Sequence, residues 1–139
     1  MEYPKELHEI AFEALDMSIF LLSQNHGALI PNVLVENLSG GKTNKVFAIE
    51  TTEEALIQAR HYLANNANSF LRYALTWDGY VTTDSNKQDA IFVEAGEAST
   101  PDGYIIAQKY VKQGFIDKKV KCIGNAFIVE EITSLVFHL

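Results

Sequence analysis

The spacing of apolar residues predicts a helix at the start of the chain. Between residues 6 and 24 they recur every three or four positions, along Leu7, Ile10, Ala14, Met17 and Leu21. A second stripe runs beside the first, along Phe12, Leu15, Ile19 and Leu22. Two adjacent stripes give a wide apolar face, so this helix is expected to pack deeply against the rest of the domain.

Residues 28–50 predict a hairpin. Pro31 cannot occupy a central strand position, so the first strand should begin after it or lie at an edge. A turn-rich cluster over residues 39–44 precedes a second strand over residues 45–50. Thr51, followed three positions later by Glu54, then matches a capping box, which predicts the start of a second helix that ends near residues 65–68.

From residue 70 onward the apolar period falls to two, which is the period of a strand. A long strand is predicted over residues 70–81, with a possible bend at Asp78-Gly79. Further strands are predicted over residues 89–97, 104–111 and 118–130. Turns rich in Gly, Pro, Asp and Asn separate them, and Thr100-Pro101-Asp102-Gly103 is the clearest of these.

This order of elements predicts one α+β domain over residues 1–139. The expected architecture is two helices packed on one face of a mostly antiparallel, curved sheet. The sheet should hold about six strands, built from an N-terminal hairpin and a four-strand meander.

Composition is consistent with an ordinary globular domain. The chain has 139 residues, 47% of them hydrophobic, and one cysteine, so no disulfide can form within it. Its first residues lack the apolar core of a signal peptide, and no apolar run approaches the ~20 residues of a membrane span. A soluble, cytoplasmic protein is therefore expected.

The net charge of −7 argues against nucleic-acid and anionic-membrane partners. Phosphate backbones attract clustered Lys and Arg. The nearest such cluster here is Lys118, Lys119 and Lys121, which stands beside Asp117.

No motif predicts a catalytic residue, a cofactor or a metal. Gly40-Gly41-Lys42-Thr43 looks like part of a phosphate-binding loop, but Glu36 stands where the motif needs its first glycine, and a strand follows instead of a helix. The four histidines show no paired metal-ligand spacing; His8 and His61 could meet only if the two helices packed together, and both are expected on solvated helix faces.

A reactive thiol and a carboxylate metal site have less support in the sequence than structural roles for the same residues. Cys122 has no visible base beside it and is expected to be a buried thiol. Asp89, Glu94 and Glu97 could hold a metal ion, but neither glutamate has the lysine two positions later that a restriction-type nuclease uses. A metal-dependent hydrolase is therefore the weakest functional alternative.

The aromatic-rich strand over residues 70–81 is the most distinctive segment. Both of its faces carry aromatic residues, and one face should belong to the core. The other face is either an exposed patch that binds a partner or a surface covered by the hairpin or the tail, and both alternatives stay open. Six candidates for ligand binding lie on this strand and its neighbours: Arg72, Tyr73, Trp77, Asp78, Glu94 and Tyr110.

The apolar tail is the second unusual segment. Residues 132–139 would fray or aggregate if they were free, so they should dock on their own domain or on another copy. This predicts a homodimer or another protein partner, with four interface candidates: Phe70, Tyr80, Leu135 and Phe137.

The best functional hypothesis from sequence is a non-catalytic protein-interaction or accessory domain. The alternative is a small-molecule binding protein or enzyme with a pocket between the helices and the sheet.

Overall fold

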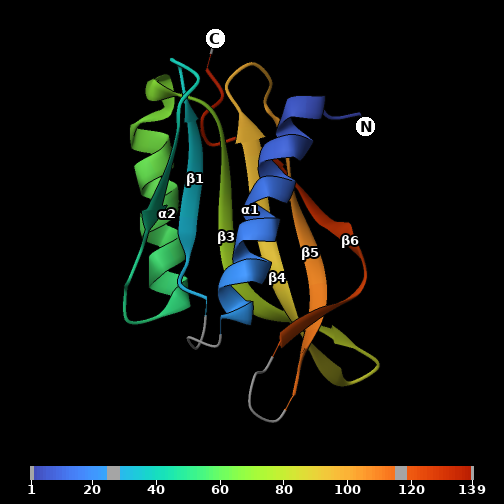
Figure 1. Ribbon diagram of the computed structural model, residues 1–139. Coiled ribbons are helices and arrows are strands. Elements are labelled where there is room, and N and C mark those ends of the chain that lie inside the picture. The colour runs from blue at the N-terminus through green and yellow to red at the C-terminus, as the bar shows by residue number, and fades with distance from the viewer. Residues whose placement is uncertain (1, 25–28, 115–118, 139) are drawn as a thin grey trace.

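The computed structural model describes residues 2–24, 29–114 and 119–138, and in these ranges it contains two α-helices and six strands (Figure 1). The helices are α1 (Lys5–Ser23) and α2 (Thr52–Asn65), and a short 3₁₀ turn (Ala67–Ser69) follows α2. The strands are β1 (Asn32–Asn37), β2 (Lys42–Val46), β3 (Phe70–Thr83), β4 (Asn86–Glu97), β5 (Asp102–Gln113) and β6 (Lys119–Thr133). Neither α-helix is long and apolar enough to span a membrane.

The predicted α+β class and order of elements are confirmed. All six strands form one antiparallel sheet in the order β2-β1-β3-β4-β5-β6. The N-terminal hairpin joins the meander through β1 and β3. β2 and β6 are therefore the two edges of the sheet, and Figure 1 shows β6 on the side away from α2.

Local sequence signals explain most element boundaries. The Thr51 hydroxyl accepts a hydrogen bond from the backbone N–H of Glu54 at 3.1 Å, as the capping box predicts. β1 begins directly after Pro31. Asp84 and Ser85 both have positive φ angles, which a two-residue hairpin loop between β3 and β4 requires.

The second strand differs from its prediction, since β2 spans Lys42–Val46 rather than residues 45–50. The backbone N–H of Phe47 still bonds the Pro31 carbonyl at 2.9 Å, but its side chain is buried in the core beneath α2. The chain thus leaves the sheet at Phe47 because the apolar ring is drawn toward the helix that follows. Residues 25–27, where the sequence Asn-His-Gly predicts the end of the first helix, lie outside the described residues.

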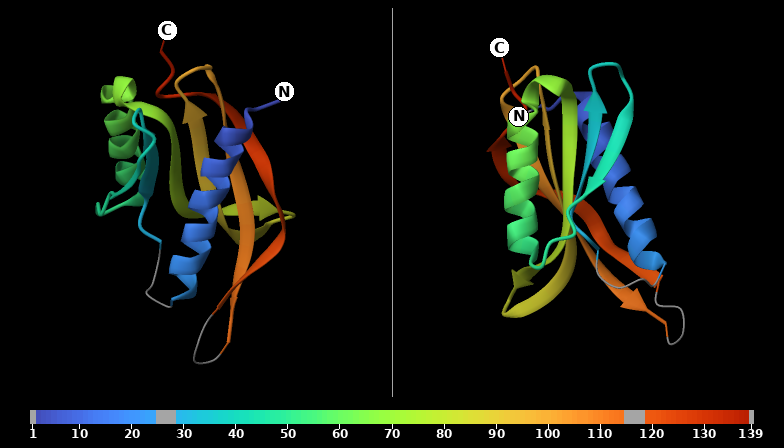
Figure 2. Two further views of the ribbon diagram at one scale, coloured as in Figure 1. Left: turned by 45° about the horizontal axis from the view of Figure 1, so that its top comes forward. Right: turned by 90° about the vertical axis from the view of Figure 1, so that its left-hand side faces the viewer.

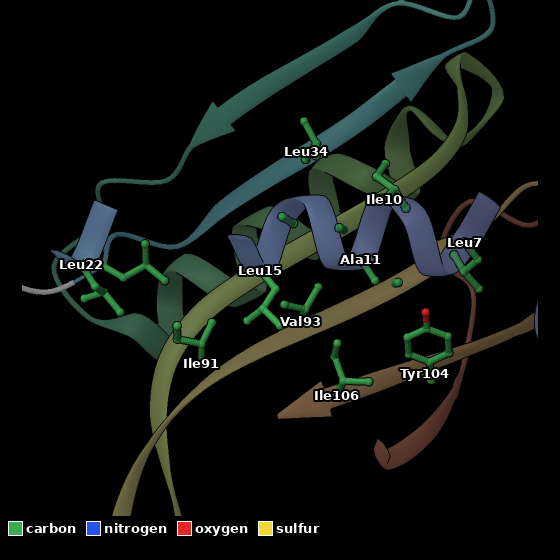
Figure 3. Packing of buried hydrophobic residues seen from close by; sticks show 14 of the residues in the cluster. Leu7, Ile10, Ala11, Leu15, Leu22, Leu34, Ile91, Val93, Tyr104 and Ile106 are labelled. Carbon is green, nitrogen blue, oxygen red and sulfur yellow. The ribbon is translucent and has the colours of Figure 1, made fainter. Parts of the chain in front are cut away.

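The expectation that both helices pack on one face is wrong. α1 packs with Leu34, Ala74 and Val93, whereas α2 packs with Val33, Val35 and Leu75. Successive strand residues point to opposite faces, so these two sets belong to opposite sides of the sheet. Figure 2 shows the helices on opposite sides, and Figure 3 shows the apolar side of α1 facing β1, β4 and β5. Because these strands carry apolar residues on both faces of the sheet, each face needs a helix to bury them.

The apolar tail docks on its own domain. The Ser134 hydroxyl donates to the Glu97 carbonyl at 2.8 Å, and Val136 is fully buried in the core beneath α2. The tail is thus buried and hydrogen-bonded within its own chain. Its apolar residues therefore give no reason to expect a dimer.

Coverage of the α2 side is incomplete. The buried apolar residues of the cluster beneath α2 come from β1, β3, α2 itself, Phe47 and the tail, and none of them comes from β5 or β6, although Ile105 and Ala107 of β5 are also buried. Figures 1 and 2 show α2 beside β1, with β5 and β6 on the far side of the sheet. One half of this face therefore carries no helix.

The close fit between tail and sheet predicts a large effect of Gly96→Ala. A Cβ at Gly96 would lie 2.6 Å from Ser134 Oγ and 2.7 Å from Tyr73 Cε1. The substitution should lower the free energy of unfolding by about 1–3 kcal/mol, as overpacking does. Gly41→Ala is the matched control, because its Cβ would meet nothing closer than Ser39 Oγ at 3.9 Å. Urea denaturation of both variants checks this; equal stabilities would contradict the docked tail.

Candidate interaction surface

A buried carboxylate ties α2 to the sheet. Glu94 on β4 is 3% exposed. Its Oε1 accepts hydrogen bonds from Nε and Nη2 of Arg60 at 3.1 and 2.9 Å, and its Oε2 accepts one from the Tyr73 hydroxyl at 2.8 Å. A buried charge is tolerated only when it is paired and hydrogen-bonded, and these three bonds supply both.

An aromatic ridge continues from this ion pair toward the uncovered half of the sheet. The Arg60 guanidinium lies 5.6 Å from the centre of the Trp77 ring, and Trp77 stacks on Phe92 with ring centres 5.5 Å apart and planes 8° apart. Both rings are half-buried. Stacking on one side and a cation on the other fix the Trp77 ring in place before any partner arrives.

The ridge borders an apolar surface over β5 and β6. Ile105 and Ala107 lie opposite Glu94 and Phe92 in the sheet, so they share the α2 side. On β6, Phe127 lies opposite Ala107 and Ile123 lies opposite Lys109, and each is 39% exposed. We call this surface the open face. Its exposed residues are Ile123 and Phe127, Trp77 and Phe92 are half-buried, and Ile105 and Ala107 between them are buried.

Lysine residues border the open face. Lys109 Nζ lies 5.7 Å from the centre of the Phe127 ring. Lys121 lies opposite Val111, which is two residues from Lys109 on β5 and so on the same side of the sheet. In a chain of net charge −7, this part of the surface thus presents cations beside apolar rings.

The six predicted ligand-binding residues divide between the two faces. Tyr73, Trp77 and Glu94 gather on the α2 side, as described above. Arg72 lies on the α1 side, where its guanidinium pairs with Glu36 and, at 3.6 Å, with Glu97.

Asp78 and Tyr110 form a separate pair on the α1 side. Their hydrogen bond, donated by the Tyr110 hydroxyl, measures 2.8 Å. The six residues are therefore three separate structural groups rather than one pocket.

Sequence reasoning missed Arg60, the residue that joins the buried carboxylate to the aromatic ridge. A signal was present in the sequence. Arg60 stands at the border of the inward stripe of α2, next to Ala59 and three positions before Leu63. A long cation beside a buried stripe indicates a charged partner under the helix, and Glu94 is that partner.

The four predicted interface residues occupy different environments. Tyr80 is 54% exposed, with Lys87 Nζ 4.4 Å from its ring centre. Phe70 is buried beneath α2, and Leu135 packs partly buried against the same core. Phe137 is half-buried in the tail.

Several residues weighed for chemistry have structural surroundings that differ from expectation. His8 is not a solvated residue: its Nδ1 lies 2.8 Å from the Tyr104 hydroxyl, and its ring stacks on Tyr104. His8 and His61 cannot meet, since their helices lie on opposite faces. Cys122 is exposed on the edge strand β6, so the prediction of a buried thiol is wrong.

The possible carboxylate and metal sites do not assemble. Glu94 and Glu97 are three residues apart on one strand and point to opposite faces. Among the described residues, no group of three or more His, Cys, Asp or Glu could hold a metal ion. Gly40 and Gly41 belong to the turn between β1 and β2, as expected.

An open groove of about 490 Å³ lies between α2 and the segment that precedes it. Lys45, His61 and Tyr62 are among its lining residues, and Lys45 Nζ is 4.7 Å from the centre of the Tyr62 ring. None of the six predicted ligand-binding residues lines this groove. Lys45 and Val46 belong to β2, so the groove lies between α2 and the edge of the sheet.

The chain matches no protein-family model, no curated protein and no solved structure.

Three buried tyrosines predict a loss of stability at alkaline pH. Burial and the neighbouring Glu94 raise the pKa of Tyr73 well above its usual value, burial raises that of Tyr104, and burial with the Asp78 hydrogen bond raises that of Tyr110. In the unfolded chain these phenols ionise near pH 10, whereas the folded state keeps their protons. The contribution of these protonated phenols to the free energy of unfolding is thus complete below about pH 10, and it falls as the pH rises further.

Urea midpoints measured between about pH 8 and about pH 11 test this expectation. The midpoint should fall steeply at the alkaline end, and Tyr73→Phe should show a shallower fall. A flat profile for the wild-type chain would contradict the burial of these phenols.

Proposed function

We propose that this domain is a non-catalytic protein-interaction module that binds a partner polypeptide on its open face. The observation that carries the proposal is the partly covered sheet. α2 and the tail cover the β1 and β3 side, while the apolar side chains of Ile123 and Phe127 on β6 stay exposed at the other side of this face. Exposed apolar surface of this kind commonly marks a protein interface.

The rigidity of the ridge supports this function. Trp77 is fixed between Arg60 and Phe92, so binding would cost little side-chain entropy. Aromatic residues and arginine dominate the binding energy of protein interfaces.

The charges at the border indicate what kind of segment binds. Lys109 and Lys121 lie at the side of the open face and Arg60 lies at its inner end, so these three cations outnumber Glu130, which lies opposite Ile105. Opposite charge steers association and aligns the partner. A segment that combines apolar side chains with Asp or Glu is therefore the proposed ligand.

A small-molecule or enzymatic role has less support from the geometry. Of the six residues suggested for it, Tyr73 and Glu94 bond to each other and to Arg60, and Asp78 and Tyr110 bond to each other. Their polar atoms are thus used within the fold rather than directed at a shared cavity.

A peptide-display library selected against the purified chain tests the proposal. Enriched sequences should combine aromatic or aliphatic residues with Asp or Glu. Their affinity should fall roughly tenfold or more for Phe127→Ser and for Lys109→Glu, because each removes one element of the surface.

Phe20→Ser is the matched control. Phe20 is 62% exposed on α1, on the opposite side of the sheet, and its loss should leave peptide binding unchanged. The proposal fails if no sequence is enriched, or if the enriched peptides respond to Phe20→Ser and not to the open-face variants.

A further inference from the structure

The two edges of the sheet differ in length and chemistry. β2 has five residues, all exposed, and four of them are polar: Lys42, Thr43, Asn44 and Lys45. A short, charged edge strand is the usual protection against pairing with another chain. β6 has 15 residues, and its middle exposes Ile123, Phe127, Ile128 and Val129 to between 39% and 49%. The sheet is thus protected at one edge and not at the other.

The order of charges along β6 is self-complementary. Lys119 and Lys121 stand near its start, apolar residues occupy its middle, and Glu130 and Glu131 stand near its end. A second copy aligned antiparallel would bring the basic start of each strand to the acidic end of the other. A parallel alignment would instead place like charges side by side, which is unfavourable.

Register shifts within β6 place Lys121 and Glu130 on the same face of the sheet. Lys121 lies opposite Val111 and Glu130 opposite Ile105, and these two β5 residues are six positions apart. An even separation along a strand means one face, so Lys121 and Glu130 share the α2 side although they are nine positions apart. The register shifts between them produce this change of phase.

The irregular middle of β6 is compatible with such pairing. Residues 119–123 and 130–133 pair with β5 in regular register, and the shifts fall between them. In an antiparallel pair related by a two-fold axis, residues 119–123 of each copy would lie beside residues 130–133 of the other copy. The irregular middle, which includes Gly124 with φ of 68°, would then lie at the axis.

We infer that two copies of this chain pair antiparallel along β6, joining their six-stranded sheets into one continuous sheet. Backbone hydrogen bonds satisfy the open edge, the apolar middle is buried, and Lys121 of each copy meets Glu130 of the other. The inference depends on the backbone edge of β6 and on its charged ends, and it shares Ile123 and Phe127 with the open face. Ile128 lies on the α1 side, opposite Ile106, so Ile128→Glu tests the dimer separately from the proposed peptide binding.

Sedimentation equilibrium at micromolar concentrations tests the inference. The expected mass is twice the 15.5 kDa of one chain. Lys121→Glu and Glu130→Lys should each weaken the dimer roughly tenfold, because each creates two like-charge contacts across the two-fold axis. The double variant K121E/E130K should regain most of the lost affinity, since it restores opposite charges in every pair.

A second pair of variants separates the β6 edge from general surface effects. Ile128→Glu should weaken the dimer by roughly tenfold or more, since it places a charge in the apolar middle. Val46→Glu is the control, because Val46 is 52% exposed on the opposite edge strand while Ile128 is 49% exposed. A monomer mass for the wild-type chain at these concentrations would overturn the inference. A dimer whose stability is unchanged by Ile128→Glu, Lys121→Glu and Glu130→Lys would also overturn the inference, since that dimer would use another surface.

Discussion

Two helices have to cover two faces of a six-stranded sheet, and the rest of the structure follows from that constraint. A helix with its side chains is about 10 Å wide and neighbouring strands are about 4.8 Å apart, so one helix alone cannot cover a whole face of six strands. α1 covers the middle of one face, and α2 with the tail covers the β1 and β3 side of the other. The open face is what remains.

The border between covered and open surface is fixed by one ion pair. Glu94 is buried where the cover of α2 ends, and Arg60 reaches it from the helix while its guanidinium also lies over Trp77. The same side chain therefore anchors α2 to β4 and orients the first ring of the open face. This links the stability of the fold to the shape of the candidate interaction surface, because loss of the pair would disturb both.

Most of the helices and strands could be predicted from the residue pattern within each element. The contacts between elements could not be predicted in this way. The change of apolar period at residue 70 and the Thr51 capping box located the strands and the second helix correctly. The side on which each helix packs depends on pairing between distant segments, as do the Arg60–Glu94 contact and the exposure of Cys122 on an edge strand. Strand order decides such features, and local spacing carries no information about it.

The most direct test of the central claim is the solvent accessibility of side chains on the two faces. A soluble paramagnetic probe added to the dilute chain broadens the NMR signals of exposed groups. The account predicts strong broadening for Phe127 and Ile123, each 39% exposed, and little for Val93 and Ile106 beneath α1. Equal protection of all four side chains would show that the β5–β6 half of the sheet is covered, and it would contradict the account.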